Sequence, residues 1–284
     1  MVDGIKKIAG RFTVALIILC FSPVHSSQRN TSMDLLDKMF LAVTKIHTAR
    51  YSLTSYERVK NKPLTASSQV KLQISPRKVY LKNTIKGIEV LWVQGKNKGD
   101  AWVNPGSFPF LTLHLDPEGE LMTKSQHHTI HQLGFGYFSE VIQKTIASIG
   151  QVAYKNITVL GDVEWDNKLC HKVYIDFSDY YKMQPYTVGK NEDLKLLSNK
   201  LHLSKFIIRA NNPNRKINQG ETINIPSIYA SKIILYVDKK STLPIYLKVI
   251  DNGGLYESYE FSDVKINSTI TEEEFTTTYK DYKF

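Results

Sequence analysis

The sequence has 284 residues and a formal net charge of +10, and hydrophobic and charged residues make up 42% and 23% of it. These fractions are usual for a folded soluble protein and exclude a protein with many membrane spans. The 16 Tyr and 12 Phe favour strands over disorder, and only 2 Cys exclude a disulfide-built or zinc-ribbon fold.

The first 27 residues have the features of an export signal. A basic start precedes an apolar run at residues 12–21, and a short polar stretch ends at Ser27. The run is about half as long as the ~20 residues that span a bilayer, which favours a cleaved signal over an uncleaved anchor. The bulky Leu19 before Cys20 argues against lipid attachment at that cysteine.

Removal of this segment lowers the positive charge only slightly. Residues 1–27 carry three bases and one acid, so the charge falls from +10 by 2 to +8. No run of five or more bases occurs, and an exported protein is not expected to bind nucleic acid. The excess charge indicates either solvated strand faces or attraction to an anionic envelope of lipid headgroups or cell-wall polymer.

Helix and strand periods alternate along the rest of the chain. An amphipathic helix is predicted over residues 32–48, with Ser32 and Asp34 as its cap. The apolar period then changes to two, and a second helix is predicted over residues 138–149 before strands resume. The predicted strands are 51–56, 70–74, 79–81, 90–93, 102–103, 111–115, 157–160, 172–177, 232–237, 245–250 and 255–261.

Short strands joined by turns predict an antiparallel sheet, because parallel strands would need a helix between each pair. A sheet of this many strands must curl to hide its edges, and the two helices are available to fill its concave side. The predicted fold class is therefore α+β, a curled antiparallel β half-barrel wrapped around helices. Its apolar lining forms either a ligand cavity or an ordinary packed core, and the residues leave both open.

The order helix, meander, helix, meander resembles the lipoprotein carriers of the LolA/LolB type. The likeness is most specific at residues 235–248, where Pro244 opens a strand after a turn, and at residues 252–267 with Phe275, which resemble the closing hairpin and tail. It covers residues 30–183 and 229–284. It implies an exported bacterial protein of an uncharacterised family in that superfamily, with a cavity for a lipid or a lipoprotein acyl chain.

Residues 184–228 resemble a LysM domain. Residues 186–194 look like its opening strand and turn, residues 197–208 carry apolar side chains where its two helices are buried, and residues 217–226 match its last turn and closing strand. Two departures are the acidic loop 191–193 and His202 in place of a glycine. Because its two strands pair, such a unit has ends about 5 Å apart and can be inserted into a hairpin of a larger sheet.

The LysM resemblance implies a shallow groove for N-acetylglucosamine-containing chains such as peptidoglycan. The groove is expected between loops 190–194 and 211–215, where amides pair with the acetamido group and Pro213 or Ile217 packs on its methyl. Alternatively, the asparagines of the second loop serve turn formation alone. The expected glycan-binding residues are Asn191, Glu192, Asp193, Leu194, Asn211, Asn212, Pro213, Asn214 and Ile217.

Catalytic and metal sites are not predicted. The cluster at His127, His128 and His131 lacks a neighbouring acid on its face, and polar residues at a helix start are the favoured interpretation. Adjacent Cys170 and His171 lie in a strand and point to opposite faces. The acids between Asp116 and Glu120 indicate a turn. No cofactor is expected.

These predictions divide the chain into a signal peptide (1–27), the first part of the half-barrel (28–183), the LysM module (184–228) and the closing strands (229–284). The favoured function is a non-enzymatic binding protein of the periplasm or cell envelope that contacts peptidoglycan and whose half-barrel holds a lipid. One alternative is a lipid or lipoprotein carrier with the insert as lid or docking element. Another is a cell-wall hydrolase that uses His131 or Asp116.

Overall fold

The computed structural model describes residues 24–108, 110–213 and 215–284, with side chains from residue 31 onward. The predicted signal sequence lies almost wholly outside these ranges, as does Cys20, so both expectations stay predictions. None of the helices in the described ranges combines the length and apolarity that a membrane crossing requires.

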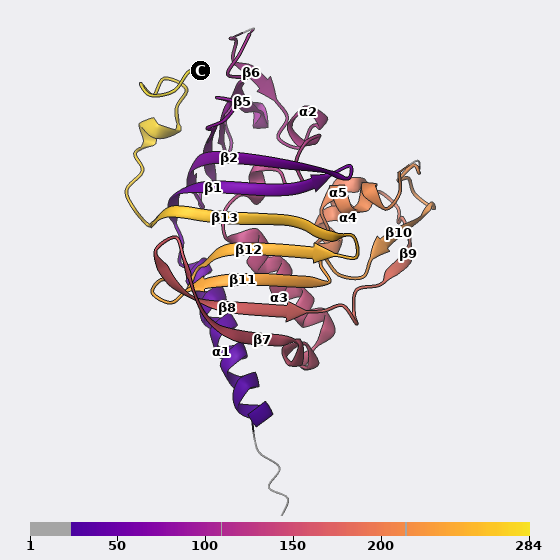
Figure 1. The fold of residues 1–284 in the computed structure, drawn as a ribbon. Coiled ribbons are helices and arrows are strands. Elements are labelled where there is room, and N and C mark those ends of the chain that lie inside the picture. Colours follow the sequence, from indigo (N-terminus) through magenta and orange to yellow (C-terminus); the bar gives the residue numbers. More distant parts are fainter. Residues whose placement is uncertain (1–23, 109, 214) are drawn as a thin grey trace, which may run out of the picture.

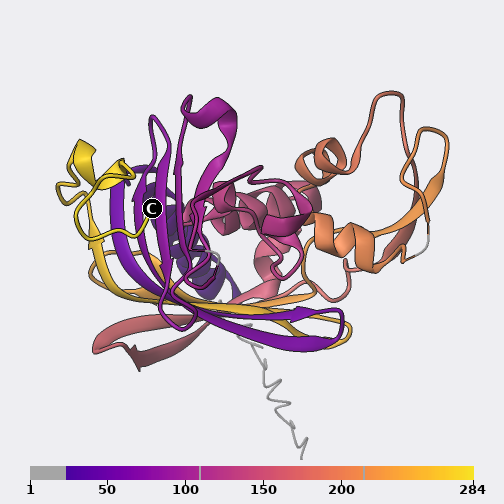
Figure 2. The same cartoon turned by 90° about the horizontal axis from the view of Figure 1, so that it is seen from above.

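Among the described residues, eleven strands form one antiparallel sheet in the order β6-β5-β4-β3-β2-β1-β13-β12-β11-β8-β7. Figure 2 shows that the sheet curls, and its edge strands β6 and β7 do not meet. The predicted antiparallel sheet is therefore confirmed as an open, curled sheet. Its strands are β1 (Thr48–Val59), β2 (Lys62–Gln73), β3 (Lys78–Asn83), β4 (Glu89–Val93), β5 (Ala101–Asn104), β6 (Leu113–Leu115), β7 (Ile157–Trp165), β8 (Lys168–Asp176), β11 (Lys232–Asp238), β12 (Pro244–Asp251) and β13 (Gly254–Ile266).

Two pairings join distant parts of the chain. Strand β1 pairs with β13, which brings Glu57 directly opposite Glu257. Strand β8 pairs with β11, with Asp176 opposite Lys232. The other neighbours are consecutive in sequence, so most of the sheet is a meander of hairpins (Figure 1).

The helices lie on the concave side of the sheet (Figure 2). The predicted second helix is confirmed, and its buried face is the predicted apolar stripe. The predicted cap of the first helix is wrong, because Ser32 and Asp34 lie inside a longer helix; Ser32 instead donates a hydrogen bond to the carbonyl of Ile157 at 3.1 Å. The helices and 3-10 turns outside the insert are α1 (Val24–Thr44), α2 (Glu120–Thr123), α3 (Gly136–Ile149), η1 (Asn97–Gly99), η2 (Ile130–Gln132), η3 (Gln151–Asn156) and η4 (Glu272–Phe275).

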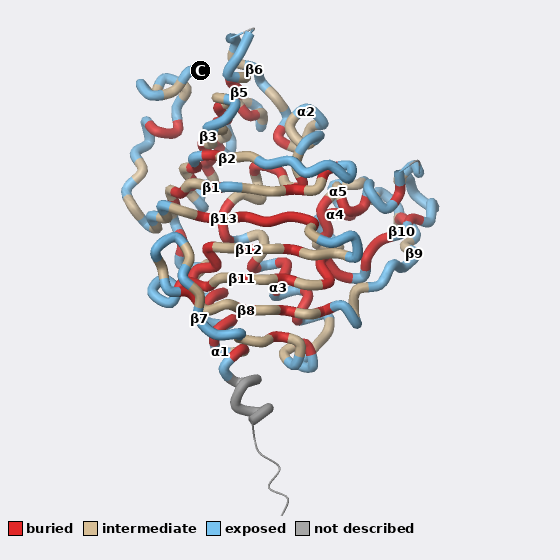
Figure 3. The backbone as a smooth tube through the Cα atoms, in the orientation of Figure 1, coloured by how far each residue is buried: buried red, intermediate tan, exposed pale blue. Residues whose placement is uncertain are grey.

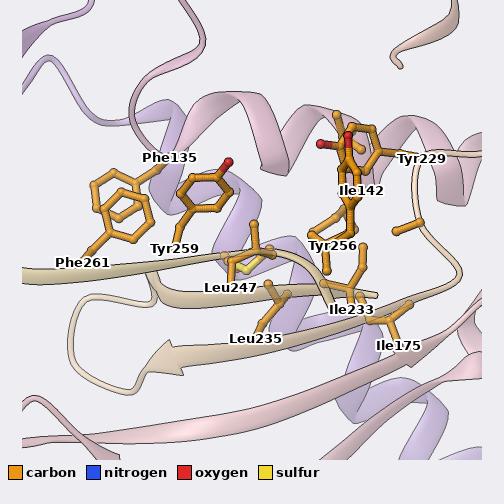
Figure 4. Packing of buried hydrophobic residues seen from close by; sticks show 14 of the residues in the cluster. Phe135, Ile142, Ile175, Tyr229, Ile233, Leu235, Leu247, Tyr256, Tyr259 and Phe261 are labelled. Carbon is orange, nitrogen blue, oxygen red and sulfur yellow. The ribbon is translucent and has the colours of Figure 1, made fainter. Parts of the chain in front are cut away.

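Buried side chains fill the space between the sheet and α3 (Figure 4). Ile142 of α3 faces aliphatic residues of β8, β11 and β12, and Phe135 stacks on Phe261 of β13 with ring centroids 4.5 Å apart. Burial is densest in the strands around β13 (Figure 3). At these positions the predicted apolar lining is a packed core.

The last sixteen residues, 269–284, form a C-terminal strap across the outer face of β2 to β5. Phe275 packs with Tyr80 and Leu91 in a second, smaller cluster, and Tyr282 stacks on Tyr80 with centroids 3.7 Å apart. Glu274 accepts two hydrogen bonds from Arg50, both at 2.7 Å. This end of the sheet is therefore covered on both faces.

Residues 183–226 form a separate strand–helix–helix–strand unit between β8 and β11. The two strands of the unit pair only with each other, in antiparallel orientation. The unit projects from one end of the large sheet, and its helices lie next to its own two-stranded sheet (Figures 1 and 2). The order of elements is the one that the LysM resemblance implies, while membership of that family stays a prediction. Its elements are β9 (Met183–Thr187), α4 (Leu194–Leu201), α5 (Lys205–Ala210) and β10 (Thr222–Pro226).

Candidate functional site

The first predicted glycan loop contains residues that stabilise the unit itself. Glu192 accepts hydrogen bonds from Lys200 at 2.6 Å, from the Gly189 amide at 2.7 Å and from the Tyr186 hydroxyl at 2.9 Å. The hydrogen bond from Lys200 is the largest cause that lowers the pKa of Glu192 to about 2. Asp193 caps α4 by accepting the Leu196 amide at 2.7 Å. These two carboxylates hold the loop in shape.

The second loop also has an internal role. The buried Asn212 side chain donates to the carbonyls of Ile208 and Asn224 at 2.8 and 2.7 Å and accepts the Asn224 amide at 2.8 Å. Asn211 donates to the Ile207 carbonyl at 2.8 Å. The interpretation that these asparagines serve local structure therefore applies directly to Asn212.

The remaining predicted glycan residues differ in exposure. Asn191 and Pro213 are exposed, and Asn191 has a left-handed backbone with φ of 60°. Leu194 and Ile217 are half-buried and pack against the main core. Asn214 lies outside the described residues. A groove between these loops stays a prediction.

A hollow with a mixed apolar and polar lining lies between α1, the turn that joins β11 to β12, and the end of β13. It has a volume of about 380 Å³. Leu41 and Leu243 lie on its apolar lining, while Lys38 and Lys45 bring positive charge to it. Leu41 is 54% exposed, so this part of the helix layer presents apolar surface to solvent. The arrangement suits an amphiphile with an apolar chain and an anionic head.

A buried network of ionisable side chains lies where the insert meets the sheet. His127 Nδ1 is 2.8 Å from Glu257 Oε2, and the His127 backbone amide donates to Glu57 Oε2 at 2.6 Å. His128 Nε2 is 3.0 Å from the same Glu257 oxygen. Glu257 is fully buried and Glu57 is 7% exposed. Two acids and two imidazoles therefore share one region shielded from water.

Tyrosines complete the hydrogen bonding of both acids. Tyr229 donates to Glu257 Oε1 at 2.5 Å, and Tyr259 donates to Glu57 Oε1 at 2.6 Å. Burial, and then the charge of Glu257, raises the pKa of each of these hydroxyls well above its ordinary value. Both hydroxyls therefore stay protonated and act as donors. Figure 4 shows Tyr229 and Tyr259 between the sheet and α3.

The charges of the network depend on one another. Burial alone would raise the pKa of Glu257, but the charges and hydrogen bonds of His128 and His127 outweigh it and hold that pKa well below its usual range. Burial would likewise lower the pKa of His128, and the charge of Glu257 reverses the direction. Each charge is stable here only with an opposite charge beside it.

The insert covers this network. Phe206 of α5 lies against the His127 ring with centroids 5.1 Å apart, and Tyr256 stacks on the ring at 4.1 Å. Ser204 Oγ is 3.4 Å from the Tyr256 hydroxyl, and Lys205 forms an ion pair with Glu118. The start of α5 is thereby anchored to the large sheet and to the loop before α2.

The reason for rejecting a metal at the histidine cluster is wrong. Neighbouring acids exist, but they come from β1 and β13 rather than from the segment of the histidines. His127 and His128 lie in a bend before η2, not at a helix start. Glu57 could have been found in the sequence, because it falls at an inward position of a strand that alternates with period two. The pairing of Glu57 with Glu257 could not have been found in the sequence.

The other rejected candidates lie apart from the network. Cys170 is buried, which raises the pKa of its thiol to about 11, whereas the half-buried His171 is 3.4 Å from Asp162. The His131 ring meets Trp92 edge-on, and burial lowers the pKa of His131. Asp116 accepts the Glu118 amide in a turn, as predicted.

Residues 47–191 match the family described as "Protein of unknown function (DUF1571)". The match covers 145 of 284 residues, just over half, so the chain belongs to this family. It runs from the start of the sheet into the first loop of the insert. No curated protein matches the chain significantly.

Several solved structures resemble the fold at low sequence identity. LprF from Mycobacterium bovis has 11% identity and a TM-score of 0.44, with 86% of this chain and 97% of LprF covered. The Mycobacterium tuberculosis lipoprotein LppX has 11% identity and a TM-score of 0.42, with 85% and 98% covered. A LolA superfamily protein from Nitrosomonas europaea has 10% identity and a TM-score of 0.31, with 87% and 98% covered. A LolA superfamily member is thus among the solved structures that the fold resembles.

Proposed function

We propose that this protein is a non-enzymatic carrier of the cell envelope that binds an acyl chain of a lipid or lipoprotein on the helix side of its curled sheet. The hollow between α1 and the sheet carries this proposal. Its apolar lining gives an acyl chain a place to leave water, and Lys38 and Lys45 supply charge for an anionic headgroup. The insert serves as a lid or docking element at the other end of the sheet.

Helix α3 contacts the sheet through apolar side chains, a contact that an acyl chain can replace. The apolar stripe of α3 packs on the sheet through Val141, Ile142 and Ile146. The hydroxyls of Ser139 and Thr145 bond to carbonyls of the helix itself. Exchanging one apolar partner of α3 for another therefore breaks none of these hydroxyl bonds, so the cost of parting α3 from the sheet is repaid by contact with the acyl chain. Helix α1 is held differently, because Ser32 bonds the Ile157 carbonyl of β7.

Mass spectrometry and a binding titration test the carrier proposal. The full chain is extracted with organic solvent to identify bound lipid, and the delipidated protein is titrated with a fluorescent fatty acid. Leu41→Asp is expected to weaken binding at least tenfold because it places a charge on the apolar lining. The control is Leu196→Asp on the insert, since Leu41 and Leu196 are 54% and 51% exposed. Absence of bound lipid together with absence of binding would refute the proposal.

A second function, binding of N-acetylglucosamine-containing glycan by the insert, is favoured by the strand–helix–helix–strand order of residues 183–226. Asn191 and Pro213 are exposed residues of the two loops that form none of the internal hydrogen bonds described above for Asp193 and Asn211. Asn191→Gly combined with Pro213→Ala is expected to reduce sedimentation with purified peptidoglycan. Asn61→Gly is the control, because Asn61 is an exposed asparagine of the host sheet with φ of 61°, close to the 60° of Asn191. If the intact protein stays in the supernatant, this function is rejected.

A further inference from the structure

The buried acids of the network need a positive partner. Glu57 and Glu257 lie directly opposite each other on neighbouring strands, an arrangement that is unfavourable for like charges. The adjacent Arg58 pairs with Asp251 instead, and its backbone carbonyl faces His127. The negative charge of the two acids must therefore be balanced by a proton or a cation placed between the carboxylates and the imidazoles.

The hydrogen bonds of His127 identify where positive charge must sit. Its Nε2 is 3.1 Å from the carbonyl oxygen of Arg58, which only accepts, so Nε2 carries a hydrogen. In a neutral ring Nδ1 then has a lone pair, and that lone pair points at Glu257 Oε2 from 2.8 Å. Two acceptors at this distance require a proton or a metal ion between them.

His128 adds a second nitrogen at the same place. Its Nε2 lies 3.0 Å from the Glu257 oxygen that faces His127. The His128 side chain is 9% exposed, and its Nε2 is also 3.2 Å from the Tyr229 hydroxyl. The rings of Tyr137, Phe138 and Tyr259 pack around the imidazole and hold it with Nε2 directed toward Glu257.

We propose that Glu57, His127, His128 and Glu257 bind one divalent transition-metal ion of the zinc type. The donor atoms of Glu57, His127 and Glu257 lie within 4.8 Å of one another. His128 lies outside this group, and its Nε2, 3.0 Å from Glu257 Oε2, must turn towards the other donors to become the fourth ligand. Tetrahedral bonds of about 2.0–2.1 Å need donor atoms about 3.4 Å apart. The 2.8 and 3.0 Å distances from Glu257 Oε2 must therefore widen by a few tenths of an ångström, and donor pairs as far apart as 4.8 Å must close by up to about 1.4 Å. A charge of +2 balances the two carboxylates with both imidazoles neutral.

The surroundings match those of metal ligands in proteins. The His127 Nε2–H bond to a backbone carbonyl fixes the tautomer with Nδ1 free to ligate, and the hydroxyls of Tyr229 and Tyr259 orient the two carboxylates. With His128 as the fourth ligand no position stays open, which makes this a structural site rather than a catalytic one. The ion would fasten the segment around His127, and with it α5 of the insert, to strands β1 and β13.

Metal content and zinc titration test this proposal on the full chain, purified without a polyhistidine tag. After chelator treatment and dialysis, calorimetric titration is expected to show one Zn²⁺ per chain, and Zn²⁺ is expected to raise the melting temperature. Glu257→Gln is expected to weaken zinc binding at least 100-fold. His131→Gln is the matched control, because His131 belongs to the same segment but contacts Trp92 rather than the network.

Two results would overturn the proposal. One is a wild-type protein that binds no Zn²⁺ in the titration and melts at the same temperature with and without chelator, which means that protonated imidazoles alone balance the acids. The other is a folded Glu257→Gln protein that binds zinc as tightly as the wild type. Should Glu257→Gln not fold, His128→Ala is measured in its place with the same expected loss. The Co²⁺-substituted wild type adds a readout, since its visible absorption bands report a tetrahedral site with nitrogen and oxygen ligands.

Discussion

Asn212 is the residue at which a structural role and a glycan-binding role can be separated most sharply. Its amide bonds three backbone groups, namely the Ile208 carbonyl in the last turn of α5 and the carbonyl and amide of Asn224 in the middle of β10. It thus joins the last helix of the insert to its closing strand, on the edge of β10 that β9 does not cover. We expect Asn212→Ala to unfold the insert locally and leave the large sheet intact.

The size of the effect follows from the three lost bonds. Each contributes a net 0.5–1.5 kcal/mol, and the change leaves partly buried backbone groups unpaired, so a loss of about 3 kcal/mol is expected for the unit. A unit as small as residues 183–226 has a low free energy of unfolding, because it buries little apolar surface. Asn211→Ala removes a single bond to the Ile207 carbonyl from an exposed side chain, and a loss of about 1 kcal/mol or less is expected.

Hydrogen exchange measured by mass spectrometry resolves the two parts of the chain. Peptides from residues 183–226 should lose about 100-fold in protection in Asn212→Ala, since 1.4 kcal/mol corresponds to a factor of ten, while peptides from β1 and β13 remain protected. Unchanged exchange together with weaker glycan retention would refute the structural role and make Asn212 a ligand contact. Equal loss of protection in both parts would show that the insert does not open separately.

Four further predictions test the core, the strap, a turn and the thiol. Ile142→Ala, at a site 1% exposed, should lower the free energy of unfolding by about 2–5 kcal/mol in a denaturant titration. The hydrogen bond from Arg50 is the main cause that lowers the pKa of Glu274 from 4.5 to about 2. The ionised Glu274 therefore stabilises the strap fully above about pH 4.5, and this stabilisation is lost as the pH falls towards 2. Near-UV circular dichroism of the strap tyrosines should follow the loss, and the Glu274→Gln protein should not show this pH dependence. Gly106→Ala should destabilise by about 1–3 kcal/mol more than Gly95→Ala, because both glycines have positive φ but only the Cβ at Gly106 would lie 2.6 Å from a backbone oxygen. Burial raises the pKa of the Cys170 thiol to about 11, so peptide mapping after iodoacetamide treatment at pH 8 should find it unmodified in the folded protein and modified in urea.

Local patterns in the sequence predict local structure well here. The period of two in the strands and the apolar stripe of α3 each record a single buried face, which is a property of neighbouring residues. The cap at Ser32 failed for the opposite reason. Its hydroxyl bonds the carbonyl of Ile157, 125 positions away, and a polar residue buried in mid-helix by such a contact looks like a cap when only its neighbours are considered.

The buried network could not be predicted, because it depends on pairings between the two ends of the chain. Glu57 and Glu257 are 200 positions apart and meet only because β1 pairs with β13 in one register. A shift of that register by one residue would turn Glu257 to the other face of the sheet. The C-terminal strap escaped prediction for a similar reason, because its aromatic residues pack on the outer face of β3 and β4 without a period of their own.

If the insert acts as the lid proposed above, its position would couple its movement to the charge state of the buried network. The His127 ring lies between Tyr256 and Phe206, so lifting α5 from the sheet removes one wall of the network and admits water to the two acids. Whatever balances those acids in the closed form, whether protons on the imidazoles or a bound ion, interacts more strongly with them in the dry closed form than in the wet open form. By linkage, binding of that positive charge favours closure, and closure strengthens its binding by the same factor. A ligand that docks on the insert would therefore change the affinity of the buried network for the proton or ion that balances its acids. It would do so although the predicted glycan loops contribute no residue to the network.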